Sequence, residues 1–496
     1  MDVAWGSRLS GETKGLDILG IRALDQNIEA SLTNGITTIS IRARYISILA
    51  WAIGRYFVDE SAGGPVQHDK EARAIYFNRV RFMVLAATYV DQGPSEVGVM
   101  GSDSYGAEAE ALRAGSSVRL PDTGNMALLN TYFGPASALG LVESRPESSG
   151  LPFGLTARGT AMYRERDKQL EGTGLIELLR NGGELDHETA QSARPAFSLA
   201  RTSEFGREAE LLREALTDAW VPGNSMAAKR VAEAYEKMTE TCTWLERELK
   251  NGTTGANQLI AKNYDRAVSN GARGIEYEWA SFEWHRRVHF ALELLLAAIT
   301  KTLINVGSMS ISQVISTWAS TSSASEPLSA HWHAPARVAA SLVSPGQFTG
   351  SLLKPDDYGG DPQVQALRAF QIIVTQARDS QIFGRTSNKR MRSSSPAART
   401  IEILENGDGT LSDVLLAICD ECVAQRHIAN TMRKMGNQQD CSLRFYPDGP
   451  VLVPTGIDIA PSYSGSRLQN TIRILADIKM LNLGTNGADA ADVAAS

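Results

Sequence analysis

The stretch LGLVESRPESSGLPFGLTARGTAMYRER, residues Leu139–Arg166, joins an apolar turn to a polar segment with proline and glycine, and then to a helix-like run. The apolar pair at 141–142 predicts the start of a strand, and the polar residues 145–150 predict the tip of a hairpin. Residues 153–155 then predict the returning strand. The stretch therefore predicts a two-stranded β-hairpin between two helices.

The residues on either side of this hairpin carry helix-end signals. Gly140 suits the left-handed conformation that closes many helices, so a helix over Asn125–Leu139 is expected to end there. Thr156 predicts the N-cap of a helix over Ala157–Leu170, because its hydroxyl can accept a hydrogen bond from a free backbone N–H of the first turn. A helix, a hairpin and a further helix in this order indicate a winged-helix domain.

The spacing of these residues resembles the end of the winged-helix domains of MarR-like regulators. Those domains carry Gly-Leu followed by Ile or Val, then a variable wing, and then Leu-Thr-x-x-Gly. Here the first motif is GLV at 140–142 and the second is LTARG at 155–159. The resemblance implies a winged-helix fold for this part of the chain.

Contact with DNA is a separate question. The expected recognition helix, Asn125–Leu139, contains no lysine or arginine, and the wing offers Arg145 and Arg158 against Glu143 and Glu147. Phosphate contacts from basic side chains position such domains on DNA and supply much of their affinity. The pattern favours a winged helix that packs or contacts protein, with Arg145 and Arg158 as its candidates for binding nucleic acid.

The composition bounds the class of protein. The chain has 496 residues, of which 43% are hydrophobic and 21% charged, and its formal net charge is −7. This length exceeds one hydrophobic core, and the acidic balance argues against attachment to nucleic acid by overall charge. Residues 1–12 lack the pattern of a signal peptide, the four cysteines make no disulfide framework, and Glu293 and Lys301 interrupt the apolar run 290–306. We expect a cytoplasmic protein without a membrane span.

Apolar residues recur at helical spacing along most of the chain. Thr410 and Asp413 form a capping pair at the start of one predicted helix, and Cys441–Pro454 predicts a hairpin that turns at Pro447-Asp448-Gly449. Residues 465–483 predict a late helix, either a second helix-turn-helix element or a docking helix. The strongest helices are predicted over 39–57, 69–90, 226–251, 276–303 and 410–435.

These patterns predict a mainly α, multi-domain helical protein with a winged-helix module and a short C-terminal β-hairpin. The expected domains are an N-terminal helical domain (1–97), a winged-helix-like domain (98–172), a central helical domain (173–380), a basic flexible loop (381–400), a C-terminal helix–hairpin–helix domain (401–483) and a disordered tail (484–496).

The N-terminal segment Gly20–Phe57 is similar to the opening of a family of uncharacterised bacterial proteins. Their pattern appears here as NGITTI at 34–39, RARY at 42–45 and Trp51. Such proteins are often encoded among antiviral defence genes, so the resemblance implies a role in phage defence. The chemistry of that family is not established, and the resemblance therefore assigns no catalytic residue.

Arg42 and Arg44 lie inside an otherwise apolar helix, about 200° apart around its axis, so one carboxylate cannot serve both. We expect each to pair with an acid of the preceding helix, such as Asp25 or Glu29. The functional alternative is that one of the two arginines binds phosphate or a partner.

One basic segment stands out on this acidic chain. No acidic residue occurs from Gln381 to Ile401, and the segment holds five cations. It is either a loop that contacts nucleic acid or a solvated linker. The candidate nucleic-acid-binding residues of the segment are Arg385, Lys389, Arg390, Arg392 and Arg399.

Cys419, Cys422, His427 and Cys441 are residue types of a zinc site, but their spacing argues against one. On a helix, Cys422 and His427 are separated by about 7.5 Å along the axis and about 140° around it, whereas zinc requires every donor within about 2.3 Å. Buried structural thiols are the favoured interpretation.

His285 and His289 at positions i and i+4 could bind one metal ion, with Glu278 on the same face of the helix. No glutamate that could serve as a general base lies between the two histidines, and pairing of His289 with Glu293 is the alternative. His331 and His333 could add ligands, although no sequence signal places them near this helix.

The sequence contains no Walker phosphate loop, no dinucleotide-binding glycine motif and no nucleophile elbow. The leading hypothesis is therefore a non-enzymatic nucleic-acid-associated or adaptor subunit of a bacterial antiviral defence or DNA-processing complex, with other protein subunits as partners and no cofactor. The alternatives are a metal-dependent hydrolase that uses His285 and His289, and a protein scaffold without nucleic-acid contact.

Overall fold

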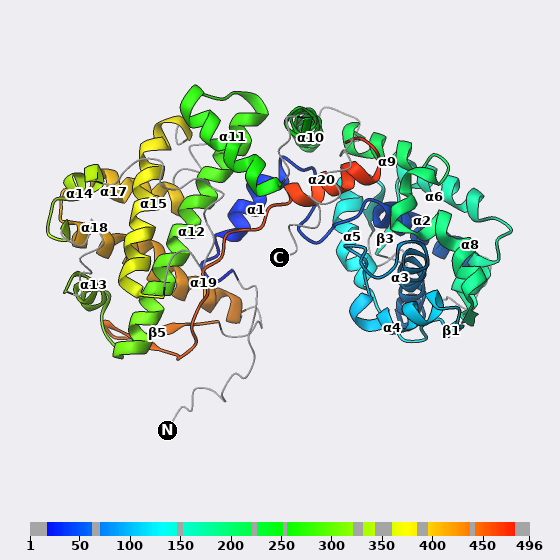
Figure 1. The fold of residues 1–496 in the computed structure, drawn as a ribbon, viewed down its shortest axis with the longest axis horizontal. Helices are drawn as coiled ribbons and strands as arrows, with labels where there is room; N and C mark the ends of the chain where they lie inside the picture. Colours follow the sequence, from blue (N-terminus) through cyan, green and yellow to red (C-terminus); the bar gives the residue numbers. More distant parts are fainter. Residues whose placement is uncertain are drawn as a thin grey trace, which may run out of the picture. The chain divides into compact units, whose positions relative to one another are not determined.

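The computed structural model is mainly helical, as the periodicity predicted, with a few short strands (Figure 1). The chain divides into two compact units, each made of two stretches of sequence. Unit 1 is Met1–Ile28 with Ile260–Ser464, and unit 2 is Glu29–Leu259 with Gly465–Ser496. The structure describes residues 17–61, 70–145, 152–220, 226–250, 255–320, 331–342, 360–383, 395–436 and 442–481.

Unit 1 is built around α12 (Gly274–Val306), which packs along α15 (Pro362–Phe383) (Figure 1). Leucine, isoleucine and alanine side chains from both helices fill its hydrophobic core. The other elements among the described residues are α13 (Ile311–Ser320), α14 (Ala336–Leu342), α17 (Pro396–Asn406), α18 (Leu411–Ala417), a π-helical segment (Ile418–Ala424), α19 (Gln425–Gly436), β5 (Phe445–Asp448) and β6 (Val451–Pro454). Two helices cross the limits of the units, α1 (Arg22–Ala30) and α11 (Ala256–Asn270).

By length and composition α12 could span a membrane, and it is the single such helix among the residues that the structure describes. Its most apolar window has a mean hydropathy of 1.4, and 83% of that window is buried inside the protein. This degree of burial is typical of a core helix, because a lipid-facing helix would expose its apolar side chains to the bilayer.

The helix predicted over 410–435 forms as α18, the π-helical segment and α19 in succession. Its predicted capping pair is confirmed: the Thr410 hydroxyl accepts from the Asp413 N–H, and the Asp413 carboxylate accepts from the Thr410 N–H. The C-terminal hairpin also forms, but its strands pair Asp448 with Val451. The turn is therefore Gly449-Pro450, since Gly449 takes the positive φ that the turn requires.

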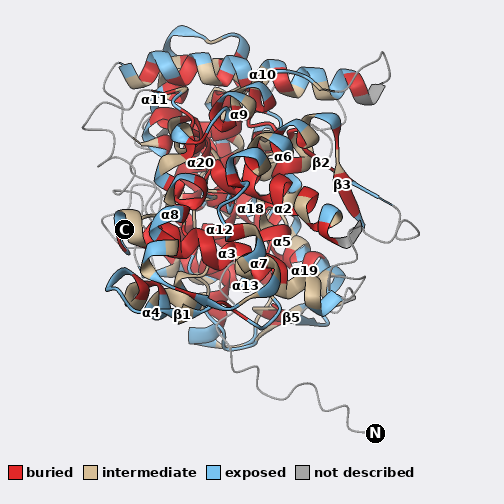
Figure 2. Cartoon of the chain, turned by 90° about the vertical axis from the view of Figure 1, so that its right-hand side faces the viewer, coloured by how far each residue is buried: buried red, intermediate tan, exposed pale blue. Residues whose placement is uncertain are grey.

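Unit 2 contains α2 (Arg44–Ser61), α3 (Lys70–Gln92), α4 (Ser102–Arg113), β1 (Val118–Arg119), α5 (Ala127–Ala138), β2 (Val142–Ser144), β3 (Phe153–Leu155), α6 (Ala157–Leu170), α7 (Leu175–Asn181), β4 (Glu184–Leu185), α8 (His187–Phe197), the 3-10 helix η2 (Leu199–Glu204), α9 (Glu208–Thr217), α10 (Met226–Lys250) and α20 (Leu468–Asp477). Along α10, exposed and buried residues alternate with helical spacing, as in an amphipathic helix (Figure 2).

The hairpin expected from the opening stretch is present as β2 and β3, with Val142 opposite Leu155 and Ser144 opposite Phe153. Gly140 has the predicted positive φ of 67°. Thr156 caps α6 as predicted, with its hydroxyl accepting from the Gly159 N–H. β1 pairs with β4 and leaves the hairpin two-stranded.

The helix predicted from Ile39 begins five residues later, at Arg44. Thr37 and Ser40 bond each other through their hydroxyls and backbone, which holds this stretch in a turn. The N–H groups of Ile41 and Arg42 donate to the Tyr132 hydroxyl. These contacts hold the residues before Arg44 outside the helix.

The sequence-predicted domain borders near residues 97 and 172 fall inside unit 2, and the border near 400 falls inside unit 1. Each unit also includes a distant stretch: α20 belongs with unit 2, and residues 17–28 belong with unit 1. The expected tail, 484–496, lies outside the described residues.

Substitution of two helical glycines tests how closely the start of the hairpin packs against α6. A Cβ on Gly159 would lie 1.8 Å from the Leu141 carbonyl oxygen, whereas a Cβ on Gly134 of α5 meets nothing within 4 Å. Gly159→Ala should lower the free energy of unfolding by about 1–3 kcal/mol or more through overpacking. Gly134→Ala should raise it by about 0.5–1 kcal/mol, because alanine loses less backbone entropy. Urea denaturation measures both, and equal effects would contradict the wing packing.

Candidate functional site

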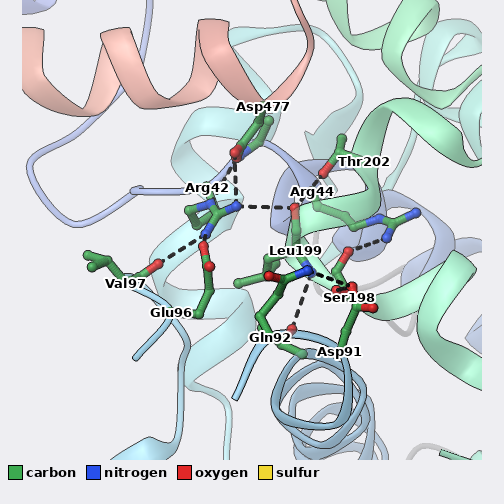
Figure 3. A network of polar contacts seen from close by, with 12 residues as sticks. Arg42, Arg44, Asp91, Gln92, Glu96, Val97, Ser198, Leu199, Thr202 and Asp477 are labelled. Carbon is green, nitrogen blue, oxygen red and sulfur yellow. Dashed lines mark hydrogen bonds and ion pairs between the residues drawn. The ribbon is translucent and has the colours of Figure 1, made fainter. Parts of the chain in front are cut away.

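The N-terminal end of α2 is the centre of a buried polar network in unit 2 (Figure 3). The Arg42 guanidinium, about 8% exposed, forms two hydrogen bonds with Asp477 of α20, from Nε at 3.0 Å and from Nη2 at 2.9 Å. It also contacts the Glu96 carboxylate and donates to the carbonyls of Val97 and Leu199. The Ala43 N–H donates to Asp477 as well, so this carboxylate also occupies a free N–H just before α2.

Arg44 occupies a second, fully buried part of the network. Its Nη2 donates to Glu208 of α9 at 2.9 Å, and its guanidinium also reaches the carbonyls of Pro195 and Ser198. Arg166 of α6 forms an ion pair with the same Glu208, which also accepts from the Ser47 hydroxyl. One carboxylate thus compensates two guanidinium groups. Backbone carbonyls accept from both arginines, those of Pro195 and Ser198 from Arg44 and that of Ala196 from Arg166.

The partners expected for these two arginines were wrong. Asp25 bonds His289 and Ser464 in unit 1, and Glu29 accepts from Ser466 and from the Arg467 N–H in unit 2. The true partner of Arg44 is Glu208, 164 residues later in the sequence, and those of Arg42 are Glu96 and Asp477, 54 and 435 residues later. Sequence proximity carries no information about such contacts.

Burial and the neighbouring positive charges have opposite effects on the pKa values of the carboxylates in this network. Burial raises the pKa of Asp477 despite the nearby Arg42. Burial also acts to raise the pKa of Asp91, but hydrogen bonds from Arg201 and Ser198 outweigh it and lower that pKa. These side chains bond one another and the backbone, so the network joins α2, α9, α20 and η2 and leaves its charges internally compensated.

Removal of the central carboxylate tests this arrangement. Glu208→Gln should lower the free energy of unfolding by about 3–5 kcal/mol, because two buried guanidinium groups lose their compensating charge. Glu210→Gln is the matched control: Glu210 pairs with Arg207 at an exposed position of the same helix, where the pair contributes at most about 1 kcal/mol. A small effect of Glu208→Gln in chemical denaturation would show that the pair is solvated.

A second buried cluster lies in unit 1, around Glu283 of α12. Its carboxylate accepts from Arg286 Nη2 at 2.7 Å, Arg287 Nε at 2.9 Å and the Tyr463 hydroxyl at 2.7 Å. Burial acts to raise the pKa of Glu283, but the two arginines outweigh it and hold the pKa below its ordinary value. The Arg287 guanidinium also lies over the Tyr264 ring at 4.0 Å. This cluster is another packed and compensated arrangement.

Of the residues in the predicted metal site, the two histidines lie close together. The His285 and His289 rings are 6.3 Å apart on α12, and His289 Nδ1 bonds Asp25 Oδ1 at 2.6 Å. The alternative pairing of His289 with Glu293 is wrong, because Glu293 bonds Arg22. No group of three or more histidine, cysteine, aspartate or glutamate side chains is placed to hold a metal ion within the described ranges, so Glu278 does not complete a set with the histidines.

The thiols and the imidazole with the residue types of a zinc site are separate in structure and role. Cys419 and Cys422 are buried in the π-helical segment, and burial raises the pKa of both thiols. His427 lies one helix further on, where its Nε2 accepts from the Arg444 N–H at 3.0 Å. The prediction of buried structural thiols thus agrees with the structure for these two, while Cys441 lies outside the described residues.

His427 generates a pH test. Burial lowers its pKa from 6.5 to about 4. The unfolded chain therefore binds a proton at a higher pH than the folded protein, so stability should fall as pH decreases from about 6.5 to 4 and this contribution should then level off. His427→Gln keeps an acceptor for Arg444 but cannot titrate. Denaturation at pH 7 and pH 4.5 should show a smaller loss in the variant, and an equal loss would refute the buried neutral imidazole.

Three of the basic residues predicted to bind nucleic acid are described, and each forms hydrogen bonds or ion pairs within the protein. Arg145 bonds Glu143 at 3.2 Å beside the wing. Arg158 donates to the carbonyls of Leu139 and Asp218 and to the Tyr235 hydroxyl. Arg399 forms ion pairs with Glu402 and Glu421. Arg385, Lys389, Arg390 and Arg392 lie outside the described residues.

The α5 helix, expected to be the recognition helix, has no charged residue, and its exposed positions include Asn130 and Gly134. Sequence reasoning missed the carboxylates that organise the buried clusters, Glu208, Glu283 and Asp477. Glu208 and Glu283 carried no local signal, since an acid on a helix is usually a solvated residue.

No family model, no curated protein and no solved structure matches the chain.

Proposed function

We propose that the protein is a non-enzymatic adaptor subunit of a bacterial assembly that processes or defends against nucleic acid. The observation that carries this proposal is the internal use of its chemistry. In the residues that the structure describes, the buried carboxylates and guanidinium groups of the two clusters bond one another or the backbone, and no three ligand side chains gather for a metal ion. Such a molecule acts through its surfaces.

The segment α5–β2–β3–α6 is, in this proposal, a winged-helix module used for protein contact. Its support is the order of these elements, the hairpin register and the Thr156 cap. In some winged helices a third strand pairs with the wing hairpin. Here β1 pairs with β4 instead, so it does not extend the β2–β3 hairpin. Because α5 has no basic side chain, and Arg145 and Arg158 are bonded internally, the module lacks the phosphate contacts of a DNA-reading helix.

Nucleic-acid contact is assigned in this proposal to the basic segment 385–399. Its support is compositional: five cations occur between Gln381 and Ile401 without an acidic residue, on a chain of net charge −7. Arg399 contributes least, since Glu402 and Glu421 already compensate it. The assignment to antiviral defence rests on the similarity of Gly20–Phe57 to proteins encoded among defence genes, and the predicted partners are other subunits of that assembly.

Fluorescence anisotropy with labelled duplex DNA tests the nucleic-acid contact. At about 50 mM salt the full chain should bind, and replacing Arg385, Lys389, Arg390 and Arg392 with serine should weaken binding at least tenfold and flatten its salt dependence. Arg145→Ala with Arg158→Ala should leave affinity unchanged, and Arg399→Ser should have the smaller effect within the segment. If DNA is not bound, or if binding survives the fourfold change, the scaffold without nucleic-acid contact replaces this part of the proposal.

Affinity purification from the native host tests the protein contact. Gly134→Glu places a charge on the exposed, uncharged face of α5 and should remove partners that the wild type retains. Arg164→Glu, an exposed change on α6, is the control and should retain them. Equal recovery with both variants would exclude α5 as the contact surface.

A further inference from the structure

The imidazoles of His285 and His289 share a hydrogen-bond arrangement on consecutive turns of α12. His285 Nδ1 lies 2.9 Å from the Ser281 carbonyl oxygen, and His289 Nδ1 lies 2.6 Å from Asp25 Oδ1. Carbonyl and carboxylate oxygens only accept, so each Nδ1 carries the proton and donates it. In the neutral form of each ring, Nε2 then holds a lone pair.

Neither lone pair is used within the described part of the chain. His289 is 2% exposed, and its Nε2 is buried without a hydrogen-bond partner. His285 is partly exposed, and the structure gives no hydrogen bond to its Nε2. Buried polar atoms are normally satisfied, so an orphaned acceptor beside a second free acceptor points to a missing occupant.

We propose that His285 and His289 form an open two-imidazole site for a divalent transition metal ion of the zinc class. In metal sites, a ligating histidine almost always donates its other ring N–H to a carboxylate or a backbone carbonyl, which orients the ring and raises its basicity. Asp25 and the Ser281 carbonyl already provide these partners, and the Ser464 hydroxyl holds the second oxygen of Asp25 at 3.0 Å.

The separation of the rings is compatible with a shared ion. An ion about 2.1 Å from each Nε2 would join rings whose centroids lie about 5–6 Å apart, and the observed separation is 6.3 Å. A small rotation of the partly exposed His285 closes the difference. Because no third protein ligand is in place among the described residues, water completes the coordination.

The ion would act as a structural clasp between α1 and α12. Metal on His289 Nε2 strengthens the hydrogen bond from Nδ1–H to Asp25, which lies on α1. This role is independent of the proposed adaptor function, since it concerns the assembly of unit 1 alone.

Equilibrium dialysis of the chelator-treated full chain against Zn²⁺ tests the proposal. The wild type should take up one ion per chain, and thermal unfolding should move to higher temperature in its presence. Co²⁺ should give d–d absorption that reports nitrogen ligation. His285→Ala and the double variant with His289→Ala should each lose this uptake, and Asp25→Asn should weaken it by about 10- to 100-fold.

His187→Ala is the matched control. His187 also directs Nδ1 to a backbone carbonyl, that of Leu112, but it has no second imidazole on its helix. The His187→Ala variant should bind Zn²⁺ as the wild type does. Circular dichroism checks that each variant is folded. His285→Ala is included as a single variant because the His285 side chain is partly exposed, so its loss should disturb the core less than loss of His289. Absence of stoichiometric uptake by the wild type, uptake that persists in the double variant, or an unchanged affinity of Asp25→Asn would overturn the proposal.

Discussion

The ion pair between Arg42 and Asp477 is the contact on which the organisation of unit 2 depends. It joins the start of α2 to a helix 435 residues later in the chain, and the same carboxylate receives the N–H of Ala43. A buried guanidinium is tolerated only when its donors find acceptors. Arg42 meets that requirement with Asp477, Glu96 and two backbone carbonyls, so α20 must be in place before α2 can be fully satisfied.

The same constraint recurs in unit 1. Glu283 of α12 binds two arginines of its own helix and the hydroxyl of Tyr463, and Arg286 donates to the Ser464 carbonyl. Both units thus use buried charge to hold a late segment of the chain against early or central helices. Charged side chains committed to such contacts are poorly placed to bind a ligand, and the proposal of an adaptor function rests on this observation.

Local signals in the sequence were sufficient for local structure. The Gly140 turn, the Thr156 cap and the Thr410–Asp413 capping box involve neighbours within a few residues, and each forms as predicted. The C-terminal hairpin was predicted over Cys441–Pro454; its strands span Phe445–Pro454, and its turn moved to Gly449-Pro450. The start of α2 was misplaced, because Tyr132 and Asp477 act on it from distant parts of the chain. The partners of Arg42 and Arg44 were missed for the same reason.

A double-mutant cycle on Arg42 and Asp477 tests the central claim most directly. The free energies of unfolding of Arg42→Ala, Asp477→Ala and the double variant are compared with that of the wild type. A buried, bidentate pair should give a coupling energy of about 1–3 kcal/mol. Additivity within about 0.3–0.5 kcal/mol would mean that the two side chains do not interact, and would contradict the dependence of unit 2 on this ion pair.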